Sequence, residues 1–199
     1  WNMDGWDDLT FGNSSGGLRT FINNQGNGFT SIHLPVTQQT EAKSIMWLDI
    51  DDDGDMDLYY SDAEGRAEIA ENIGDTLFIN VTAFTNIEQV EMPSEGCSWG
   101  DYDNDGDLDL YICRYYESEE DVGSEYRNVL MRNDGDFQFT DVTAESFTGI
   151  YARASFQSVW YDWDRDGFQD LFVINDKDGA NTLFHNLQNG QFEDIASQV

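Results

Sequence analysis

An acidic motif that recurs along the chain constrains the fold more than any other feature of the sequence. The pattern Asp-x-Asp-x-Asp-Gly-x-x-Asp stands at 49–57, 101–109 and 162–170, and a fourth copy is already in progress at residue 1, with its first position missing. The glycines of the four copies are Gly5, Gly54, Gly106 and Gly167, so the copies lie 49, 52 and 61 residues apart. Repetition at such a period predicts one structural unit for each copy.

A second pattern alternates with the first. In each unit an Asn is followed six residues later by a Phe, with Gly, Asp or Asn between them and apolar residues before the Asn. The pairs are Asn23 and Phe29, Asn72 and Phe78, Asn133 and Phe139, and Asn186 and Phe192. Apolar segments on both sides of such a turn predict a β-hairpin. Each unit then holds two hairpins, and four short strands per unit are typical of β-propeller blades.

We therefore predict an all-β fold, a β-propeller built of four-stranded antiparallel blades, within a single repeat domain over 1–199. Its units run approximately over 1–30, 31–85, 86–145 and 146–199, and the first unit lacks its innermost strand. The longest period comes from an insertion at 114–127. We interpret this insertion either as a solvated loop or, given its three tyrosines, as a loop that contacts a ligand.

The acidic loops carry the chemistry. Two carboxylates ~4 Å apart repel each other by roughly 1–4 kcal/mol, so a loop that gathers several of them favours a bound cation. Ligands that are all oxygen suit Ca²⁺, and the glycine at the sixth position permits the sharp turn. An EF-hand would close with Glu at position 12, where this chain has Phe11, Tyr60, Ile112 and Val173. The ninth position must close the loop instead. The alternative is that these loops are solvated acidic turns.

This interpretation predicts three complete calcium sites and one incomplete site. The ligands are the side chains at loop positions 1, 3, 5 and 9 and the carbonyl at position 7. They are Asn2, Asp4, Trp6 and Asp8 in the incomplete first copy; Asp49, Asp51, Asp53, Asp55 and Asp57; Asp101, Asp103, Asp105, Asp107 and Asp109; and Asp162, Asp164, Asp166, Phe168 and Asp170.

Two cysteines and two glycosylation sequons give information about the cellular compartment of the chain. If the strands pair symmetrically around the third loop, Asp101 faces Asp109 and Cys97 faces Cys113, so a cross-strand disulfide is predicted, with two buried thiols as the alternative. A disulfide would favour an oxidising location. Asn13 and Asn80 begin Asn-x-Ser/Thr sequons, which are a weak signal.

The charge balance excludes several classes of partner. Forty acidic residues stand against nine basic ones, for a formal net charge of −31. Such a chain is a poor ligand for nucleic acid and for anionic membrane surfaces, and no apolar run approaches the length that spans a bilayer. Only His33 and His185 could act as bases near neutral pH, and we interpret His185 as a strand residue. We expect no catalytic residues.

Two stretches carry a family resemblance. Residues 99–111 read Trp-Gly-Asp-Tyr-Asp-Asn-Asp-Gly-Asp-Leu-Asp-Leu-Tyr, and an Asn-Val-Leu-Met-Arg-Asn-Asp-Gly stretch at 128–135 is followed by Phe-Thr-Asp-Val-Thr at 139–143. The chain resembles the FG-GAP/VCBS repeat family, the calcium-bearing propeller blades of integrin α-subunits and many secreted bacterial proteins, and most of all its ASPIC/UnbV-like branch. The resemblance implies the same calcium ligands, an extracellular setting, and a role in adhesion, in protein or carbohydrate contact, or as a rigid accessory domain.

Family propellers usually have more blades than the four units counted here. The chain is then a fragment of a larger propeller, a small ring, or a subunit that borrows a strand from a neighbour. We expect a calcium-binding, extracellular, non-catalytic propeller module for adhesion, ligand binding or scaffolding, whose partner is a protein, a carbohydrate or copies of itself. One alternative is a self-assembling subunit of a fibre or oligomer, formed by strand addition. The other is a calcium-stabilised part of a secreted carbohydrate-active enzyme.

Overall fold

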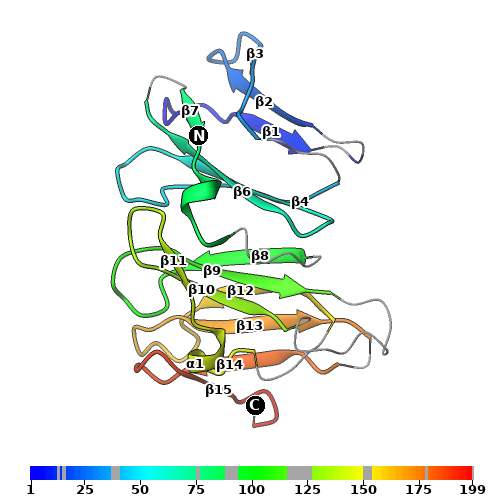
Figure 1. The fold of residues 1–199 in the computed structure, drawn as a ribbon, viewed down its shortest axis with the longest axis vertical. Coiled ribbons are helices and arrows are strands. Elements are labelled where there is room, and N and C mark those ends of the chain that lie inside the picture. Colours follow the sequence, from blue (N-terminus) through cyan, green and yellow to red (C-terminus); the bar gives the residue numbers. More distant parts are fainter. Residues whose placement is uncertain are drawn as a thin grey trace. The chain divides into compact units, whose positions relative to one another are not determined.

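The computed structural model describes residues 1–12, 14, 17–36, 41–74, 77–87, 94–115, 127–149, 154–177 and 179–198. Within these ranges the regular secondary structure is almost entirely β-strand, arranged as separate antiparallel sheets that follow one another along the sequence (Figure 1). The chain divides into two compact units, Trp1–Glu91 and Met92–Val199. None of the described helices has the length and hydropathy that a bilayer crossing requires.

The first unit holds two sheets whose strands neighbour each other in chain order. One is the three-stranded sheet β1-β2-β3, and the other is the four-stranded sheet β4-β5-β6-β7, followed by the short 3₁₀ helix η1. The bounds are β1 Leu9–Gly12, β2 Leu18–Asn23, β3 Phe29–Ile32, β4 Ala42–Leu48, β5 Asp57–Asp62, β6 Ala67–Asn72, β7 Phe78–Asn80 and η1 Thr82–Phe84.

The second unit repeats this arrangement with two four-stranded sheets, β8-β9-β10-β11 and β12-β13-β14-β15, and one short helix, α1. The bounds are β8 Ser94–Gly100, β9 Asp109–Arg114, β10 Val129–Asn133, β11 Phe139–Asp141, α1 Thr143–Ser146, β12 Ser155–Tyr161, β13 Asp170–Asn175, β14 Thr182–Asn186 and β15 Phe192–Asp194. Sequential up-and-down sheets of this kind are propeller blades. The predicted all-β, blade-type fold is confirmed, and the first described sheet has three strands.

Packing between neighbouring sheets supplies the core of each unit. In the second unit the side chains of Tyr111, Leu130, Leu171 and Phe184 lie in one buried cluster that draws on both sheets. β12 packs against β8 and β9 there. In the first unit Leu58 and Ala70 are buried against Trp47 and its neighbours. The middle strands β5, β6, β9 and β10 are buried along nearly their whole length, whereas β2 and β13 are covered less completely.

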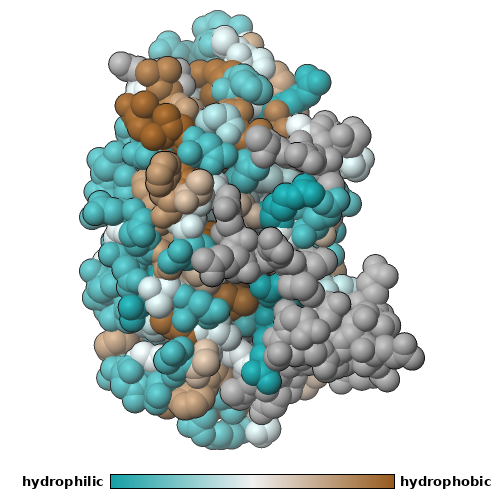
Figure 2. All heavy atoms as spheres, in the orientation of Figure 1, coloured by the Kyte–Doolittle hydropathy of each residue, from teal (hydrophilic) through white to brown (hydrophobic). Residues whose placement is uncertain are grey.

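Two glycines in β8 permit the close approach of β12. A Cβ atom on Gly96 would lie 2.6 Å from the backbone oxygen of Phe156, and one on Gly100 would lie 2.6 Å from the Trp160 ring. Any larger residue would therefore push the two sheets apart. On the face of the molecule shown in Figure 2, hydrophilic side chains cover much of the described surface, as the net charge of −31 requires.

The register around each acidic loop corrects the predicted strand pairing. Gly100 pairs with Asp109, whereas the prediction paired Asp101 with Asp109. The same offset of one residue occurs in the other two complete repeats, where Leu48 pairs with Asp57 and Tyr161 with Asp170. The first Asp of the motif therefore lies in the loop and not in the ladder.

This register also overturns the predicted disulfide. Cys97 pairs with Ile112, and Gly96 pairs with Cys113. A shift of one residue places a side chain on the other face of a sheet, so the two sulfur atoms point to opposite faces. Both cysteines are buried thiols that form no disulfide, and burial raises the pKa of Cys113 to about 12. The alternative of two buried thiols is the correct one.

Candidate metal centres

The four acidic motifs share one backbone conformation. The fourth loop position and the glycine at the sixth position both have positive φ in every copy, including the incomplete one. The values are 56° and 87° for Met3 and Gly5, 58° and 92° for Asp52 and Gly54, 60° and 103° for Asn104 and Gly106, and 64° and 91° for Arg165 and Gly167. Glycine adopts such angles without steric cost, which explains its place at position 6.

Hydrogen bonds inside each loop turn the carboxylates inward. The carboxylate at position 1 accepts from the glycine N–H. The pairs are Asp49–Gly54, Asp101–Gly106 and Asp162–Gly167, at 3.1, 3.2 and 3.0 Å. The carboxylate at position 5 accepts from the N–H of position 7. The pairs are Asp4–Trp6, Asp53–Asp55, Asp105–Asp107 and Asp166–Phe168, at 2.9, 2.8, 3.0 and 2.9 Å. The backbone thus fixes these side chains without using all of their oxygens.

The Asp at position 9 joins the two hairpins of a unit. One oxygen accepts from the N–H of position 2, in the pairs Asp57–Ile50, Asp109–Tyr102 and Asp170–Trp163, each at 3.1 Å. The other accepts from the N–H of the Asn that opens the second pattern, in Asp8–Asn23, Asp57–Asn72, Asp109–Asn133 and Asp170–Asn186, at 2.8, 2.8, 2.9 and 2.8 Å. The two sequence patterns are therefore connected through a single buried carboxylate.

Carboxylates converge in each of the three complete loops. Oxygen atoms of three Asp side chains lie within 4.8 Å of one another in each. The groups are Asp49, Asp51 and Asp53; Asp101, Asp103 and Asp109; and Asp162, Asp164 and Asp170. Asp57 is not a member of the second-repeat group. In the incomplete first loop, Asn2 donates to Asp4 at 3.3 Å and Asp8 lies at the base of the loop.

The electrostatics of these loops are unfavourable without a cation. Burial raises the pKa of Asp57 to about 7 and that of Asp109 to about 8. Burial, followed by the charge of the neighbouring Asp, also raises the pKa of Asp51 and Asp103. One buried oxygen of Asp49 and one of Asp103 have no hydrogen-bond donor within the part of the chain that is described. Buried oxygens without donors are what metal ligands offer, so the loops fit a hard cation.

The sequence analysis placed His185 in a strand but did not reveal that its strand position lies beside the acidic loop. This position is the residue before the second-pattern Asn, and it carries Glu71, Arg132 or His185 in the complete repeats. His185 Nδ1 lies 3.1 Å from an oxygen of Asp170 and 3.8 Å from one of Asp164, and it forms a group with Asp164 and Asp166. The backbone N–H of the following Asn donates to the Asp at loop position 9, and this hydrogen bond brings the side chain close to the loop. The alternation of the two sequence patterns is therefore the signal that could have revealed this position.

The two sequons have different outcomes. Asn13 lies outside the described residues. Asn80 lies at the end of β7, where its side chain donates to Glu68 at 3.2 Å and accepts from the Thr82 N–H at 3.0 Å. Asp141 accepts in the same way from the residue two positions on, at 2.9 Å. The sequon at Asn80 therefore occupies a turn position of the repeat, and its glycosylation stays a prediction.

Comparison with protein families decides what these repeats are. The model of the FG-GAP-like repeat matches the chain four times, over 1–60, 49–112, 122–173 and 162–199. The chain belongs to the FG-GAP-like repeat family. The four matches cover most of its length, and two pairs of them overlap, over 49–60 and 162–173, where the second and the fourth acidic loops lie. The predicted bounds of the units stay a prediction. No curated protein matches the chain.

Proposed function

We propose that this FG-GAP-like chain is a calcium-binding module of propeller type that acts outside the cell by binding other molecules, without catalysis. The observation that carries the proposal is the convergence of three carboxylates in the same turn of three successive repeats. Oxygen-only donors in a flexible loop suit Ca²⁺ better than Mg²⁺, which demands a stricter octahedral geometry. A bound ion would supply positive charge where the loop concentrates negative charge.

The proposed role of calcium is structural. In the third repeat Asp109 belongs to the carboxylate group and also accepts from Tyr102 and Asn133, which lie in the two hairpins of that blade. An ion at that loop would hold Asp109 ionised and so strengthen both charge-assisted bonds. At a Kd around 10⁻⁴ M, ~1 mM Ca²⁺ stabilises a fold by roughly 1.4 kcal/mol per site. Three such sites are a large part of a typical stability of about 5–15 kcal/mol.

An extracellular location and a non-catalytic role complete the proposal. Millimolar calcium outside cells suits sites of modest affinity. Within the described residues, the clusters of three metal-ligating side chains lie in the acidic loops or, in one case, add the neighbouring His185, so metal binding accounts for these clusters without an acid–base pair. The alternatives of a fibre subunit and of a part of a carbohydrate-active enzyme stay open.

The test is thermal unfolding of the metal-free protein, titrated with Ca²⁺ and, separately, with Mg²⁺. We expect Tm to rise strongly with Ca²⁺ and weakly with Mg²⁺. Asp103→Asn should lower the Tm gained from calcium, because it weakens the third loop. Asp136→Asn, at an exposed acid outside the loops, is the matched control and should keep the full gain. An equal response of the metal-free protein to NaCl and to CaCl₂ at the same ionic strength would refute calcium binding.

A further inference from the structure

The residue that faces the Asp at loop position 9 differs in charge from blade to blade. Across the middle strands Leu58 pairs with Ala70, Leu110 with Met131 and Leu171 with Phe184. One step closer to the loop, position 9 therefore faces the residue before the second-pattern Asn. The facing pairs are Asp57 and Glu71, Asp109 and Arg132, and Asp170 and His185. Residues that face each other in this way lie on one side of the sheet, with Cβ atoms ~4.5–5.5 Å apart.

Contacts in the second unit agree with this placement. His185 Nδ1 lies 3.1 Å from an oxygen of Asp170. Arg132 lines a cavity of about 320 Å³ together with Asp103 of the third loop. The Nε of Arg132 also donates to Asp134, which lies outside the loop, at 2.7 Å. The guanidinium therefore places positive charge at the edge of the third loop, although it shares that charge with Asp134.

The second and third loops feel charges of opposite sign at this position. Burial, followed by the charges of Asp53 and Asp51, raises the pKa of Glu71. This carboxylate therefore adds negative charge beside the second loop. Burial raises the pKa of Asp103 in the third loop, and the charge of Arg132 acts against that rise. One loop thus has an extra anion beside it, and the other has an extra cation.

The second loop (49–57) and the third loop (101–109) are otherwise closely matched. Both have Asp at positions 1, 3, 5, 7 and 9 and Gly at position 6, with similar φ angles at positions 4 and 6. Position 4 is Asp52 in the second loop and the neutral Asn104 in the third, which adds to the same difference in charge. Protein loops tune their affinity for Ca²⁺ through the number of charges that they gather.

We propose that the residue facing position 9 sets the calcium affinity of its loop, so that the second loop binds Ca²⁺ more tightly than the third. Glu71 attracts the doubly charged ion, whereas Arg132 repels it and already offsets part of the negative charge of its loop. As the calcium concentration rises, the second loop then fills before the third. The inference rests on the proposed calcium binding and adds to it the order in which the two loops fill.

The test is calorimetric titration of the metal-free protein with Ca²⁺ in the presence of a competing chelator, with native mass spectrometry to count the bound ions. Asp51→Asn and Asp103→Asn, at position 3 of the second and third loops, each disable one loop. The binding step that each variant loses identifies the Kd of that loop, and two retained ions show that the rest of the protein is folded. We expect the Kd of the second loop to be at least about tenfold lower than that of the third.

Charge variants test the facing residue itself. Glu71→Gln should raise the Kd of the second loop at least about threefold and leave the third unchanged. Arg132→Gln should lower the Kd of the third loop at least about threefold and leave the second unchanged. The double variant Glu71→Arg, Arg132→Glu should narrow or reverse the order of the two loops. Both side chains are only half-buried, so all of these variants should keep the fold.

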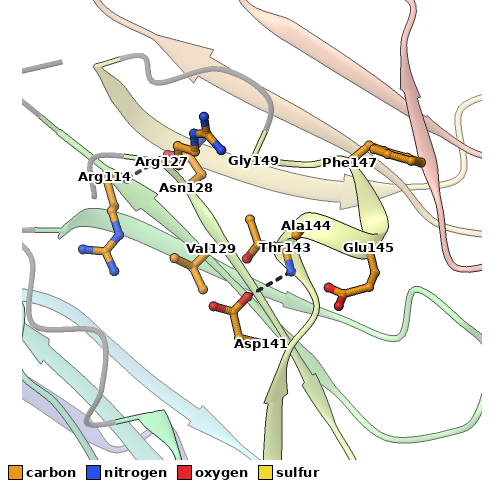
Figure 3. A pocket seen from close by; sticks show the side chains of 10 residues that line it. All are labelled: Arg114, Arg127, Asn128, Val129, Asp141, Thr143, Ala144, Glu145, Phe147 and Gly149. Carbon is orange, nitrogen blue, oxygen red and sulfur yellow. Dashed lines mark hydrogen bonds between the residues drawn. The ribbon is translucent and has the colours of Figure 1, made fainter. Parts of the chain in front are cut away.

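Two exposed residues provide controls with the same changes in charge. Figure 3 shows Arg127 and Glu145 around a pocket that also contains Arg114, the residue at the end of β9 opposite the third loop. Arg127 stands five residues before Arg132, about 16 Å away along an extended chain and beyond the Debye length of about 8 Å. Arg127→Gln and Glu145→Gln should therefore leave the Kd of every loop unchanged.

The inference and the proposed function fail in distinguishable ways. Three bound ions with equal Kd values in the second and third loops would overturn the inference and leave calcium binding intact. Shifts in Kd that are as large in Arg127→Gln and Glu145→Gln as in the variants of Arg132 and Glu71 would also overturn it, because the effect would then come from net charge alone. A protein that binds no calcium would refute the proposed function, and the order of filling with it.

Discussion

The residue that most affects the chemistry of each blade is the Asp at loop position 9. Sequence reasoning identified it only as a metal ligand, because strand pairing is needed to reveal its second role. In the structure it accepts from two backbone N–H groups of different hairpins, as Asp109 does from Tyr102 and Asn133. A single carboxylate then determines both how the loop closes and how the second hairpin attaches.

The raised pKa values of these residues predict how the stability of the metal-free protein depends on pH. Burial holds the folded pKa of Asp57 at about 7 and that of Asp109 at about 8, above the ~3.9 of an unfolded chain. The folded state therefore binds protons more tightly than the unfolded state between these values. The stability that the two groups contribute is fully present below pH ~4 and is lost as pH rises through the folded pKa values.

We expect Tm of the metal-free protein to fall between about pH 5 and pH 8. Saturating Ca²⁺ should remove or reverse that trend, because the ion favours the ionised carboxylates. Thermal unfolding followed by circular dichroism across this range, with and without Ca²⁺, provides the measurement. If the Tm of the metal-free protein instead rises steadily towards pH 8, the pKa values of Asp57 and Asp109 are not raised in the folded state.

At the scale of the element, the sequence predicted which segments form hairpins but not which residues pair across them. The two alternating patterns predict four strands per unit, and three of the four sheets in the described residues have four strands in chain order, while the first has three. The register was predicted one residue too far into the loop, because Asp101 was taken as a strand residue although its carboxylate accepts from Gly106. The burial of Arg114 at the end of β9 was not predictable, because the burial of a charged strand end depends on packing that one sequence does not reveal.

Asn186 tests how the blades of the second unit are held together. Its side chain donates to the carbonyl of Tyr102 at 2.7 Å and to that of Gln169 at 3.0 Å, so it connects β14 to the acidic loops of both blades. Asn186→Ala leaves two carbonyl groups without their donor, and we expect it to lower the free energy of unfolding by about 2–4 kcal/mol. Urea denaturation measures this. Asn189→Ala, at an exposed turn position, is the control and should cost less than ~1 kcal/mol.

At the scale of the whole molecule, the net charge of −31 opposes folding through self-repulsion. Salt screens that repulsion, and each bound Ca²⁺ removes two negative charges at the places where they are densest. We therefore expect added NaCl to raise Tm markedly in the metal-free protein and much less in the calcium-loaded protein. Thermal unfolding at low and high ionic strength checks this. Equal salt effects in the two forms would mean that the loops are not where the repulsion is concentrated.

The central claim is that three repeats of this chain bind calcium in equivalent loops. Native mass spectrometry of the metal-free protein, titrated with Ca²⁺, tests it most directly. We predict a saturating series that ends at three bound ions, with a fourth ion adding only at higher concentration through the incomplete first loop, and one ion fewer in Asp103→Asn at the same calcium concentration. A broad, unsaturated distribution of adducts that is the same in the protein and in Asp103→Asn would contradict the account.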